Sequence, residues 1–385
     1  MHLITRSGNN KKTLGKINKL AISLLANSIS FVIGKNSVYT AIDIIKIVVY
    51  ASFRSLSIEG ASDELMNLCS TKICSADVIQ TRLSQKSETE LFKAFENVQE
   101  KIYIHLRKMR LLFCKMTVAI DFTDKLYYGN KNDYGVVRTK SQKGTSSCFR
   151  YITLNIVIGD AKITLAALPV KPFSNKAKLV DWVLTEAERK VKINLVLVDR
   201  GFFTKDVIRV LEMHHLKFLF PVPKNKLVKQ MIKDAHKSKN FVAKYEFKQR
   251  KKVVGSFTIF FLFNPDSKER TIWKRYHVFG TNLPVSNNTR KDLAEIYRMR
   301  WGIETSYRVE KHDFLAKTTS KSYKFRLFLF LVAVILYNFW MITRMVYGEK
   351  FYARKWKNSI YVILYSSSLQ SVETIKDSEI KTVDF

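Results

Sequence analysis

Cysteine is scarce in this chain of 385 residues. It occurs only at Cys69, Cys74, Cys114 and Cys148, and no two of these positions have the spacing of a zinc finger. Four cysteines are also too few for a disulfide scaffold of this length, so the sequence excludes a small disulfide-rich secreted fold and favours a reducing compartment. We expect these residues to be ordinary buried or half-buried thiols.

Acidic residues are also in short supply. The chain has 33 Asp and Glu against 66 Lys and Arg, which gives a formal net charge of +33. This charge extends from end to end and exceeds what solubility requires, so it predicts a polyanionic partner, with nucleic acid as the first candidate. A membrane surface is the alternative, but the 26 Phe and 17 Tyr are dispersed through strand-like runs rather than gathered on one basic amphipathic helix.

Long apolar runs are missing as well. The most membrane-like stretch, residues 327–342, has 16 residues and contains Asn338, and it is shorter than the roughly 20 residues of a membrane span. We predict a buried core helix there and no membrane partner. The first residues lack the basic start, apolar core and small-residue cleavage site of a signal peptide, so we expect a cytoplasmic protein.

Helical periodicity characterises residues 1–112. Within this region, residues 62–83 resemble a helix, a turn and a second helix, with Ser75 as the N-cap of the second. Gln80, Thr81 and Arg82 would then face a DNA groove. The same pattern also occurs in helical hairpins that bind no DNA.

Strand-like segments begin at Lys115. The expected order is three strands (116–120, 149–158 and 162–170), a helix (175–190), a strand (194–198), a helix (204–214) and a strand (218–222). This succession is typical of a ribonuclease H-like α/β fold. We therefore predict a ribonuclease H-like mixed sheet flanked by helices.

A basic segment follows the last of these strands. Residues 217–282 contain 16 Lys or Arg against four acidic residues and include three further strand-like runs. This composition predicts a β-rich insertion that contacts a DNA backbone, although a solvated sheet face would carry similar charges. The predicted regions are a helical N-terminal DNA-binding region (1–112), a core in two parts (113–216 and 283–346), the insertion (217–282) and a C-terminal tail (347–385).

Four side chains of different chemistry share one face of a predicted helix. Tyr297, Arg300, Glu304 and Lys311 are offset by 3, 7 and 14 residues. At about 100° per residue they fall within roughly 60° of one another, along about 21 Å of helix. A carboxylate among these groups indicates a metal ligand beside phosphate-binding side chains. The charged outer face of an ordinary amphipathic helix is the alternative.

Two aspartates follow apolar strand-like runs. Asp121 and Asp199 each stand where a charge is expected only if the strand emerges or something binds the carboxylate, although turn and cap residues occur there too. Together with Glu304 they supply the oxygen ligands that Mg²⁺ prefers. Two such ions about 3.5–4 Å apart activate a water or a 3′-hydroxyl for in-line attack on phosphorus. Asp124 is either a substitute ligand or a turn residue.

These motifs together resemble those of the insertion-sequence family-four DDE transposases. Tyr297-x2-Arg300-x3-Glu304-x6-Lys311 is similar to that family's Y-R-E-K signature. The segment Asp199-Arg-Gly-Phe is similar to its second-aspartate motif, and Val-Ala-Ile-Asp121 to its first-aspartate strand. A mostly β insertion before the glutamate helix is a further similarity. The resemblance covers roughly residues 113–345, and residues 1–112 add a compatible helical region.

The resemblance implies a role for each site residue. Asp121, Asp199 and Glu304 would be the catalytic, metal-binding triad for two Mg²⁺ ions, for which Mn²⁺ can substitute. The residues that would contact DNA are Tyr297, Arg300, Trp301, Lys311 and Arg200. Among them, Trp301 would stack on a base displaced from the duplex, unless it packs in the core. Arg200 and Gly201 would also shape the turn beside Asp199.

The implied function is cut-and-paste transposition by a prokaryotic insertion sequence. The protein would bind double-stranded DNA, namely the element's terminal inverted repeats and a target, as a homodimer at the nucleoid in the cytoplasm. Some family members cut through a DNA hairpin and others do not, and the sequence fits either route. The alternatives are a ribonuclease H-like nuclease or resolvase without strand transfer, and a DNA-binding remnant whose catalytic centre has decayed. The presence of all three acids and their signature partners argues against decay.

Overall fold

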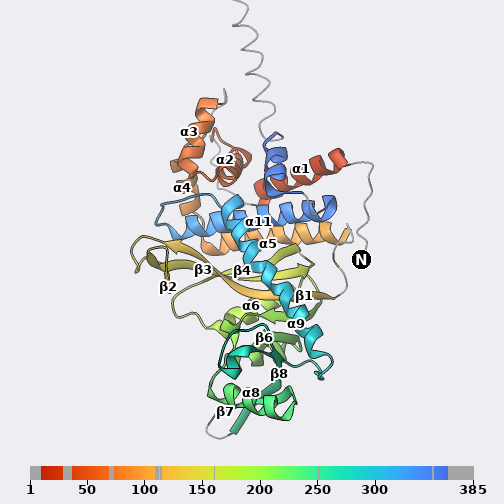
Figure 1. Ribbon diagram of the computed structural model, residues 1–385. Coiled ribbons are helices and arrows are strands. Elements are labelled where there is room, and N and C mark those ends of the chain that lie inside the picture. Colours follow the sequence, from red (N-terminus) through yellow and green to blue (C-terminus); the bar gives the residue numbers. More distant parts are fainter. Residues whose placement is uncertain are drawn as a thin grey trace, which may run out of the picture. The chain divides into compact units, whose positions relative to one another are not determined.

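The computed structural model describes residues 10–28, 37–68, 73–108, 112, 115–159, 161–249, 252–348 and 351–362. The chain divides into two compact units (Figure 1). One unit is Arg110–Thr305, and the other combines Met1–Met109 with Ser306–Phe385. We describe each unit by itself.

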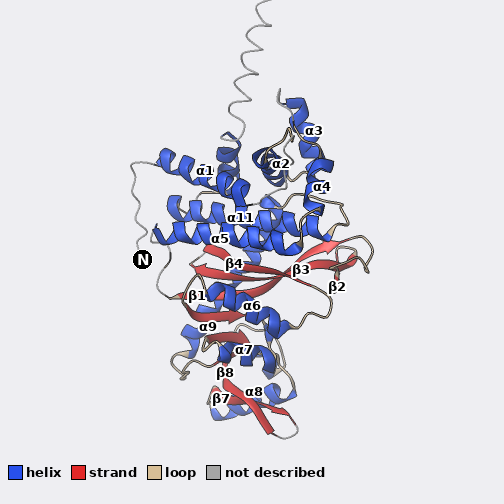
Figure 2. Cartoon of the chain, turned by 180° about the vertical axis from the view of Figure 1, so that it is seen from behind, coloured by secondary structure: helices blue, strands red, loops and turns tan. Residues whose placement is uncertain are grey.

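The unit Arg110–Thr305 is built on one mixed sheet (Figure 2). Within the described part of the chain it has nine strands: β1 (Met116–Tyr127), β2 (Val137–Gln142), β3 (Thr145–Ile158), β4 (Ala161–Val170), β5 (Ile193–Val198), β6 (Lys217–Pro221), β7 (Val242–Gln249), β8 (Lys252–Phe263) and β9 (Tyr276–Thr281). Their order is β2-β3-β1-β5-β6-β9-β8-β7, and β4 pairs with β3.

Strand directions agree with the predicted fold class. β3 runs antiparallel to both β1 and β4, whereas β5 runs parallel to β1 and to β6. Helix α6 (Lys176–Glu188) leads from β4 to β5, and α7 (Lys205–Met213) is the crossover between β5 and β6. The ribonuclease H-like mixed sheet flanked by helices is therefore confirmed.

Local sequence explains these central elements. The runs Val118-Ala-Ile120 and Val196-Leu-Val198 are completely or almost completely buried, as expected for strands covered on both faces. Both crossover helices begin at a polar cap, because the side chain of Asn175 accepts from Lys178 N–H and that of Thr204 accepts from Val207 N–H.

Residues 217–282 extend the same sheet beyond β6. β9 and β8 pair antiparallel, and β7 forms the far edge beside β8. Between β6 and β7 lies α8 (Lys226–Ser238), a helix that the sequence interpretation did not include. Its signals are present, since Asn225 caps it and Val228, Ile232 and Ala235 are buried at helical spacing.

The second unit is helical in its described part. Its helices include α1 (Asn10–Ser28), α2 (Ala41–Arg54), α3 (Ile58–Leu68), α4 (Ala76–Ser84), α5 (Glu88–Lys108) and α11 (Tyr323–Tyr347). Helix α11 is the one described helix that is long and apolar enough to cross a membrane, and its most apolar window is buried inside the protein. It packs beside α5, where Asn338 donates to the buried Gln99 Oε1 at 3.1 Å. The stretch 327–342 is thus a core helix, as predicted.

The predicted helix-turn-helix falls on α3 and α4. Its turn, residues 69–72, lies outside the described residues, and Ser75 precedes α4 without a capping side-chain hydrogen bond. Gln80 and Thr81 are exposed, while Arg82 donates to Ser37. DNA reading by this pair stays a prediction. Cys74 and Cys148 are buried free thiols, and the other two cysteines lie outside the described residues.

Candidate active site

Asp121 lies in the middle of β1, so the expectation that it ends a strand was wrong. Parallel pairing of β1 with β5 stops at Ile120 and Val198, and β1 continues to Tyr127 against β3 alone. The apolar run ends where β5 leaves, but the polar residues that follow still pair with β3. Asp121 is thus the first residue of β1 beyond the β5 ladder. Because Asp199 directly follows β5, the two carboxylates lie at the same level on neighbouring strands.

A tight turn fixes Asp199. Its side chain caps the 3₁₀ helix η1 (Arg200–Phe202), with Oδ2 accepting from Gly201 N–H at 3.2 Å. Phe202 then stacks on Phe122 with ring centroids 4.5 Å apart. Since each phenylalanine closely follows one of the two aspartates in sequence, this stack ties the two aspartate segments together. The sequence interpretation missed it.

The predicted helix carrying the signature is not continuous, which corrects the single-helix expectation. α9 (Arg290–Arg298) is followed by a 3₁₀ turn, η3 (Met299–Trp301), then by α10 (Gly302–Val309) and a π-helical turn, η4 (Glu310–Phe314). A Cβ at Gly302 would lie 3.1 Å from Cε of Lys162, so the glycine lets that side chain pack closely against the start of α10.

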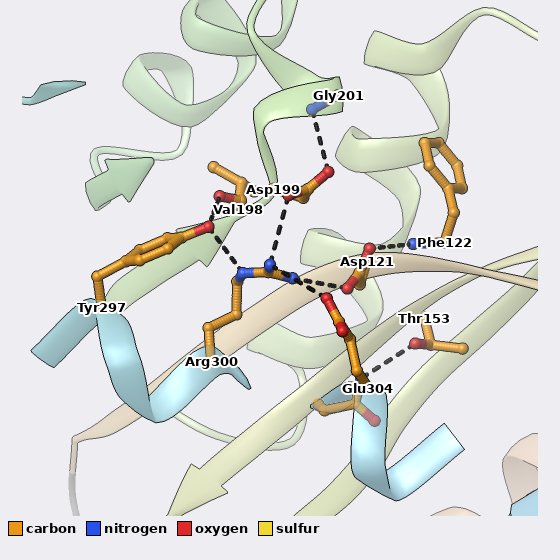
Figure 3. Close-up of polar contacts among 10 residues, drawn as sticks. Asp121, Phe122, Thr153, Val198, Asp199, Gly201, Tyr297, Arg300 and Glu304 are labelled. Atoms are coloured by element: carbon orange, nitrogen blue, oxygen red, sulfur yellow. Dashed lines mark hydrogen bonds and ion pairs between the residues drawn. The ribbon is translucent and has the colours of Figure 1, made fainter. Parts of the chain in front are cut away.

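Three carboxylates surround one guanidinium in the unit Arg110–Thr305 (Figure 3). Arg300 Nη1 lies 2.7 Å from Asp121 Oδ2, and Nη2 lies 3.4 Å from Asp199 Oδ1 and 4.0 Å from Glu304 Oε1. The remaining oxygen of Asp121 accepts from Phe122 N–H at 2.8 Å. The three acids predicted from the sequence therefore come together, with Arg300 between them.

Tyr297 supports Arg300 from behind. Its hydroxyl accepts from Arg300 Nε at 2.7 Å and donates to the Val198 carbonyl at 3.3 Å, as Figure 3 shows. Residues three apart adjoin on a helical surface, which brings the arginine over the tyrosine. Tyr297 and Arg300 are 4% exposed each, so in this state both side chains face the protein rather than solvent.

Burial dominates the electrostatics of this cluster. Burial raises the pKa of Asp121 to about 6; Arg300 opposes this rise, while Asp199 and Glu304 add to it. Burial would lower the pKa of Arg300, but Tyr297, Asp121 and Asp199 outweigh it and raise that pKa above its ordinary value. The guanidinium is therefore a fixed positive charge among groups that repel one another.

The other predicted site residues have different positions. Arg200 is exposed on η1, beside Asp199. Trp301 ends η3, and its side chain lies outside the described residues. Lys311 lies in η4, which belongs to the other compact unit. Asp124 is neither a turn residue nor grouped with the other acids, because it lies within β1 and forms a two-point ion pair with Arg150 at 2.6 and 2.7 Å.

The three acids around Arg300 are also the candidate metal ligands. Among the residues that the structure describes, no group of three or more His, Cys, Asp or Glu is arranged to hold a metal ion. The acids converge instead on the guanidinium of Arg300. Their donor chemistry, all carboxylate oxygen, nevertheless suits a hard cation such as Mg²⁺.

Comparison with known proteins places the chain among transposases. It matches the family model described as "Transposase DDE domain" over residues 115–339. It is also similar to the piggyBac transposase in its synaptic complex with hairpin DNA, with 12% identity over 95% of this chain and 82% of that chain and a TM-score of 0.54. The Mos1 strand transfer complex matches with 11% identity over 51% of this chain and 63% of that chain, but its TM-score is only 0.18. No curated protein sequence matches.

The two kinds of match support different conclusions. At such low identity, the likeness to piggyBac transposase indicates a shared fold alone. The family match supports membership in the family and not the fold alone, because it covers more than half of the chain and includes the three acids around Arg300. The chain therefore belongs to the Transposase DDE domain family.

Proposed function

We propose that this chain is a cut-and-paste DNA transposase of an insertion sequence of the family-four type. Membership in the DDE domain family implies a DNA-cleaving, phosphoryl-transfer enzyme. The observation that carries the proposal is the convergence of Asp121, Asp199 and Glu304 on one buried positive charge at 2.7–4.0 Å. The Tyr, Arg, Glu and Lys spacing supports the family-four assignment.

Two Mg²⁺ ions, or Mn²⁺ in their place, fit this donor set. Asp121, Asp199 and Glu304 would hold them in place of the Arg300 guanidinium, which lies between the three carboxylates in this structure. When bound, such ions supply activation of the attacking oxygen and stabilisation of the leaving oxygen during in-line displacement at phosphorus.

The protein's own contribution is to position the acids. Arg300 holds Asp121 and Asp199 at fixed separations, and Tyr297 holds Arg300 through a hydroxyl anchored on the end of β5. A guanidinium fork matches carboxylate and phosphate equally well. A DNA phosphate can therefore replace a carboxylate as the partner of Arg300, and Arg200 is exposed to bind a second phosphate. Lys311 and Trp301 complete the proposed DNA-contacting set.

Further parts of the proposal concern assembly and location. The net charge of +33 suits a protein that binds the terminal inverted repeats of its element and a target duplex. We propose a homodimer when the two ends are paired, working at the nucleoid in a prokaryotic cytoplasm. The division into an N-terminal DNA-binding region (1–112), a two-part core (113–216 and 283–346), an insertion (217–282) and a tail (347–385) is part of the same proposal.

Three substitutions test the assignment of the acids. Asp121→Asn, Asp199→Asn and Glu304→Gln should each reduce Mg²⁺-dependent cleavage of the element ends below detection, while end binding in a gel-shift assay persists. Asp292→Asn is the matched control, since Asp292 is an exposed acid in the first turn of α9 and should leave cleavage unchanged. Full cleavage by any of the three variants would refute the triad.

Strand transfer separates this function from the alternatives. A transposase joins pre-cleaved ends to a target plasmid, whereas a nuclease or resolvase of the same fold releases cut DNA without joining it. A decayed remnant would bind ends and do neither. Joined products seen by gel analysis of the target plasmid are the expected result.

A further inference from the structure

Two hollows flank the turn that follows Asp199. The first, of about 770 Å³, is lined by Asp199, Arg200, Tyr297, Arg298, Arg300 and Glu304 among others. The second, the Phe173 groove, has a volume of about 880 Å³. Its lining includes Lys131, Arg138, Lys171, Phe173, Lys176 and Gly201. Because Arg200 lines the first and Gly201 the second, both hollows adjoin η1.

The Phe173 groove is positively charged. Five cationic side chains line it against one acid, Asp133. Arg150 is neutralised by Asp124, and Lys176 donates to the Gly201 carbonyl. Lys131 and Arg138 are exposed and form no ion pair within the described residues. A groove with this charge attracts a polyanion and can bind phosphates along its length.

Phe173 projects from the groove wall into solvent. Its relative exposure is 105%, and its φ of +62° is a backbone conformation that bulky residues rarely adopt. A tight turn holds it there, since Lys171 N–H donates to Ser174 Oγ at 3.0 Å and Ser174 N–H donates to the Lys171 carbonyl at 3.1 Å. The protein thus presents an apolar ring to water on a fixed turn, at the cost of backbone strain.

A second exposed aromatic residue lies next to this turn. Tyr134 is 64% exposed, and Lys171 Nζ lies 5.4 Å from the centroid of its ring. Aromatic rings interleaved with cations are the surface on which unpaired nucleic-acid bases stack while their phosphates are bound. A docking site for a protein would need the apolar ring but not this excess of positive charge, so the charge favours a nucleic acid as the ligand.

We propose that the Phe173 groove binds a DNA segment, with Lys131 and Arg138 on its phosphates and Phe173 stacked on an unpaired base. This inference rests on the proposed function, because in-line displacement at phosphorus needs paths for the attacking and the leaving strand on opposite sides of the reacting phosphate. The hollow with the signature residues supplies one path, and the Phe173 groove supplies the other. The bound segment is either DNA that flanks the element end or target DNA.

The first test measures binding without chemistry. A single-stranded oligonucleotide that contains 2-aminopurine is titrated with the full-length protein in EDTA, and stacking is followed by quenching of its fluorescence. Phe173→Gly should weaken binding about 5- to 150-fold and remove the quenching, whereas Phe173→Trp should retain both. Lys131→Gln and Arg138→Gln should each lower the salt dependence of binding by about one unit of log–log slope.

Two controls separate recognition from folding. Phe173→Gly relieves the positive φ, so its melting temperature should equal or exceed that of the wild type. Met213→Ala removes a residue that is 68% exposed at the end of α7 and does not line the groove, and it should bind like the wild type. Unchanged binding and quenching in Phe173→Gly would overturn the proposal, as would a changed oligomeric state with normal DNA binding.

The second test identifies the source of the DNA. Slower cleavage of flanked element ends by Phe173→Gly would assign flanking DNA to the groove, and slower joining of pre-cleaved ends to a plasmid would assign target DNA. Normal rates in both reactions would refute the inference. A wild type that neither cleaves nor joins would refute the proposed function instead, and the fluorescence titration would still test the groove.

Discussion

Breaking the ion pair between Arg300 and Asp121 is expected to destabilise the protein strongly, and Arg300→Met breaks it from the cationic side. The two side chains are 5% and 13% exposed, and their charged atoms lie 2.7 Å apart. Removing one partner of a buried pair costs about 3–5 kcal/mol, because the other charge stays buried without compensation. A domain of this size loses about 2–4 °C of melting temperature per kcal/mol, so the expected decrease is roughly 6–20 °C.

A double-mutant cycle isolates this interaction. Asp121→Asn removes the negative charge at nearly constant volume, and the double variant leaves neither charge unpaired. The double variant should lose less unfolding free energy than the two single variants lose together, by at least about 1 kcal/mol. The measurement is urea unfolding of the four proteins in EDTA, at one pH and one salt concentration. Additivity within about 0.5 kcal/mol would refute the reasoning.

An exposed pair on the neighbouring helix is the matched control. Arg298 Nη1 lies 2.9 Å from Glu295 Oε1, but these side chains are 71% and 66% exposed. Solvent screens such pairs, so the cycle of Arg298→Met with Glu295→Gln should give less than about 1 kcal/mol. A similar coupling energy in both cycles would mean that burial is not the cause.

Divalent metal provides a second readout of the same cluster. In Arg300→Met, three carboxylates face one another without their cation, so Mn²⁺ or Mg²⁺ should raise the melting temperature more than it does in the wild type. Saturation to 100 times Kd corresponds to about 2.7 kcal/mol of added stability. An equal or smaller shift in the variant would show that Arg300 does not compete with metal for these carboxylates.

Three further predictions concern stability, each measured by urea unfolding. Burial raises the pKa of the fully buried Glu310 from its ordinary value of 4.5 to about 8, so between these values the native state holds a proton that the unfolded state has lost. The protein therefore loses stability as the pH rises, by roughly 2 kcal/mol between pH 6 and 8. Glu310→Gln should abolish this loss, and parallel pH profiles of the variant and the wild type would contradict the prediction. Phe202→Ala should cost about 3–5 kcal/mol, because Phe202 is buried and stacked on Phe122, and a cost near zero would exclude that stack. Gly280→Ala should cost about 1–3 kcal/mol, since the new Cβ would lie 2.6 Å from a phenyl ring, whereas the control Gly255→Ala has 3.8 Å of room and should fold normally.

The fold could be predicted largely because its central signals are local. Apolar runs specify β1 and β5, and caps such as Asn175 and Thr204 mark the starts of α6 and α7. The exposed edge strand β2 has no apolar run to reveal it, as its burial pattern contains no buried position. Its pairing with β3 is a tertiary property that periodicity does not encode.

The sequence predicts which acids form the candidate site but not how they are arranged. Asp121 continues a strand because β3 still pairs with it after β5 has ended, and a single sequence carries no record of that partner. The positions of Lys131, Phe173 and Lys176 in one groove depend on how loops and strands pack, since no motif spacing connects them. The burial of Arg300 likewise depends on neighbours that are distant in sequence. The residue spacing that predicted a DNA contact for Arg300 therefore could not show that its side chain is buried.

The signature spacing follows from contacts between residues three and four positions apart. Tyr297, in α9, and Arg300, in η3, are neighbours because residues three apart adjoin on a helical surface, and the tyrosine hydroxyl accepts from Arg300 Nε at 2.7 Å. Arg300 and Glu304 are neighbours because residues four apart adjoin on a helical surface, and their charged atoms lie 4.0 Å apart. A uniform α-helix predicts the same set of neighbours, which is why the helical stripe identified the residues although the helix is interrupted. Arg300 itself faces the two strand-borne aspartates and is 4% exposed, so it does not lie on a solvated stripe.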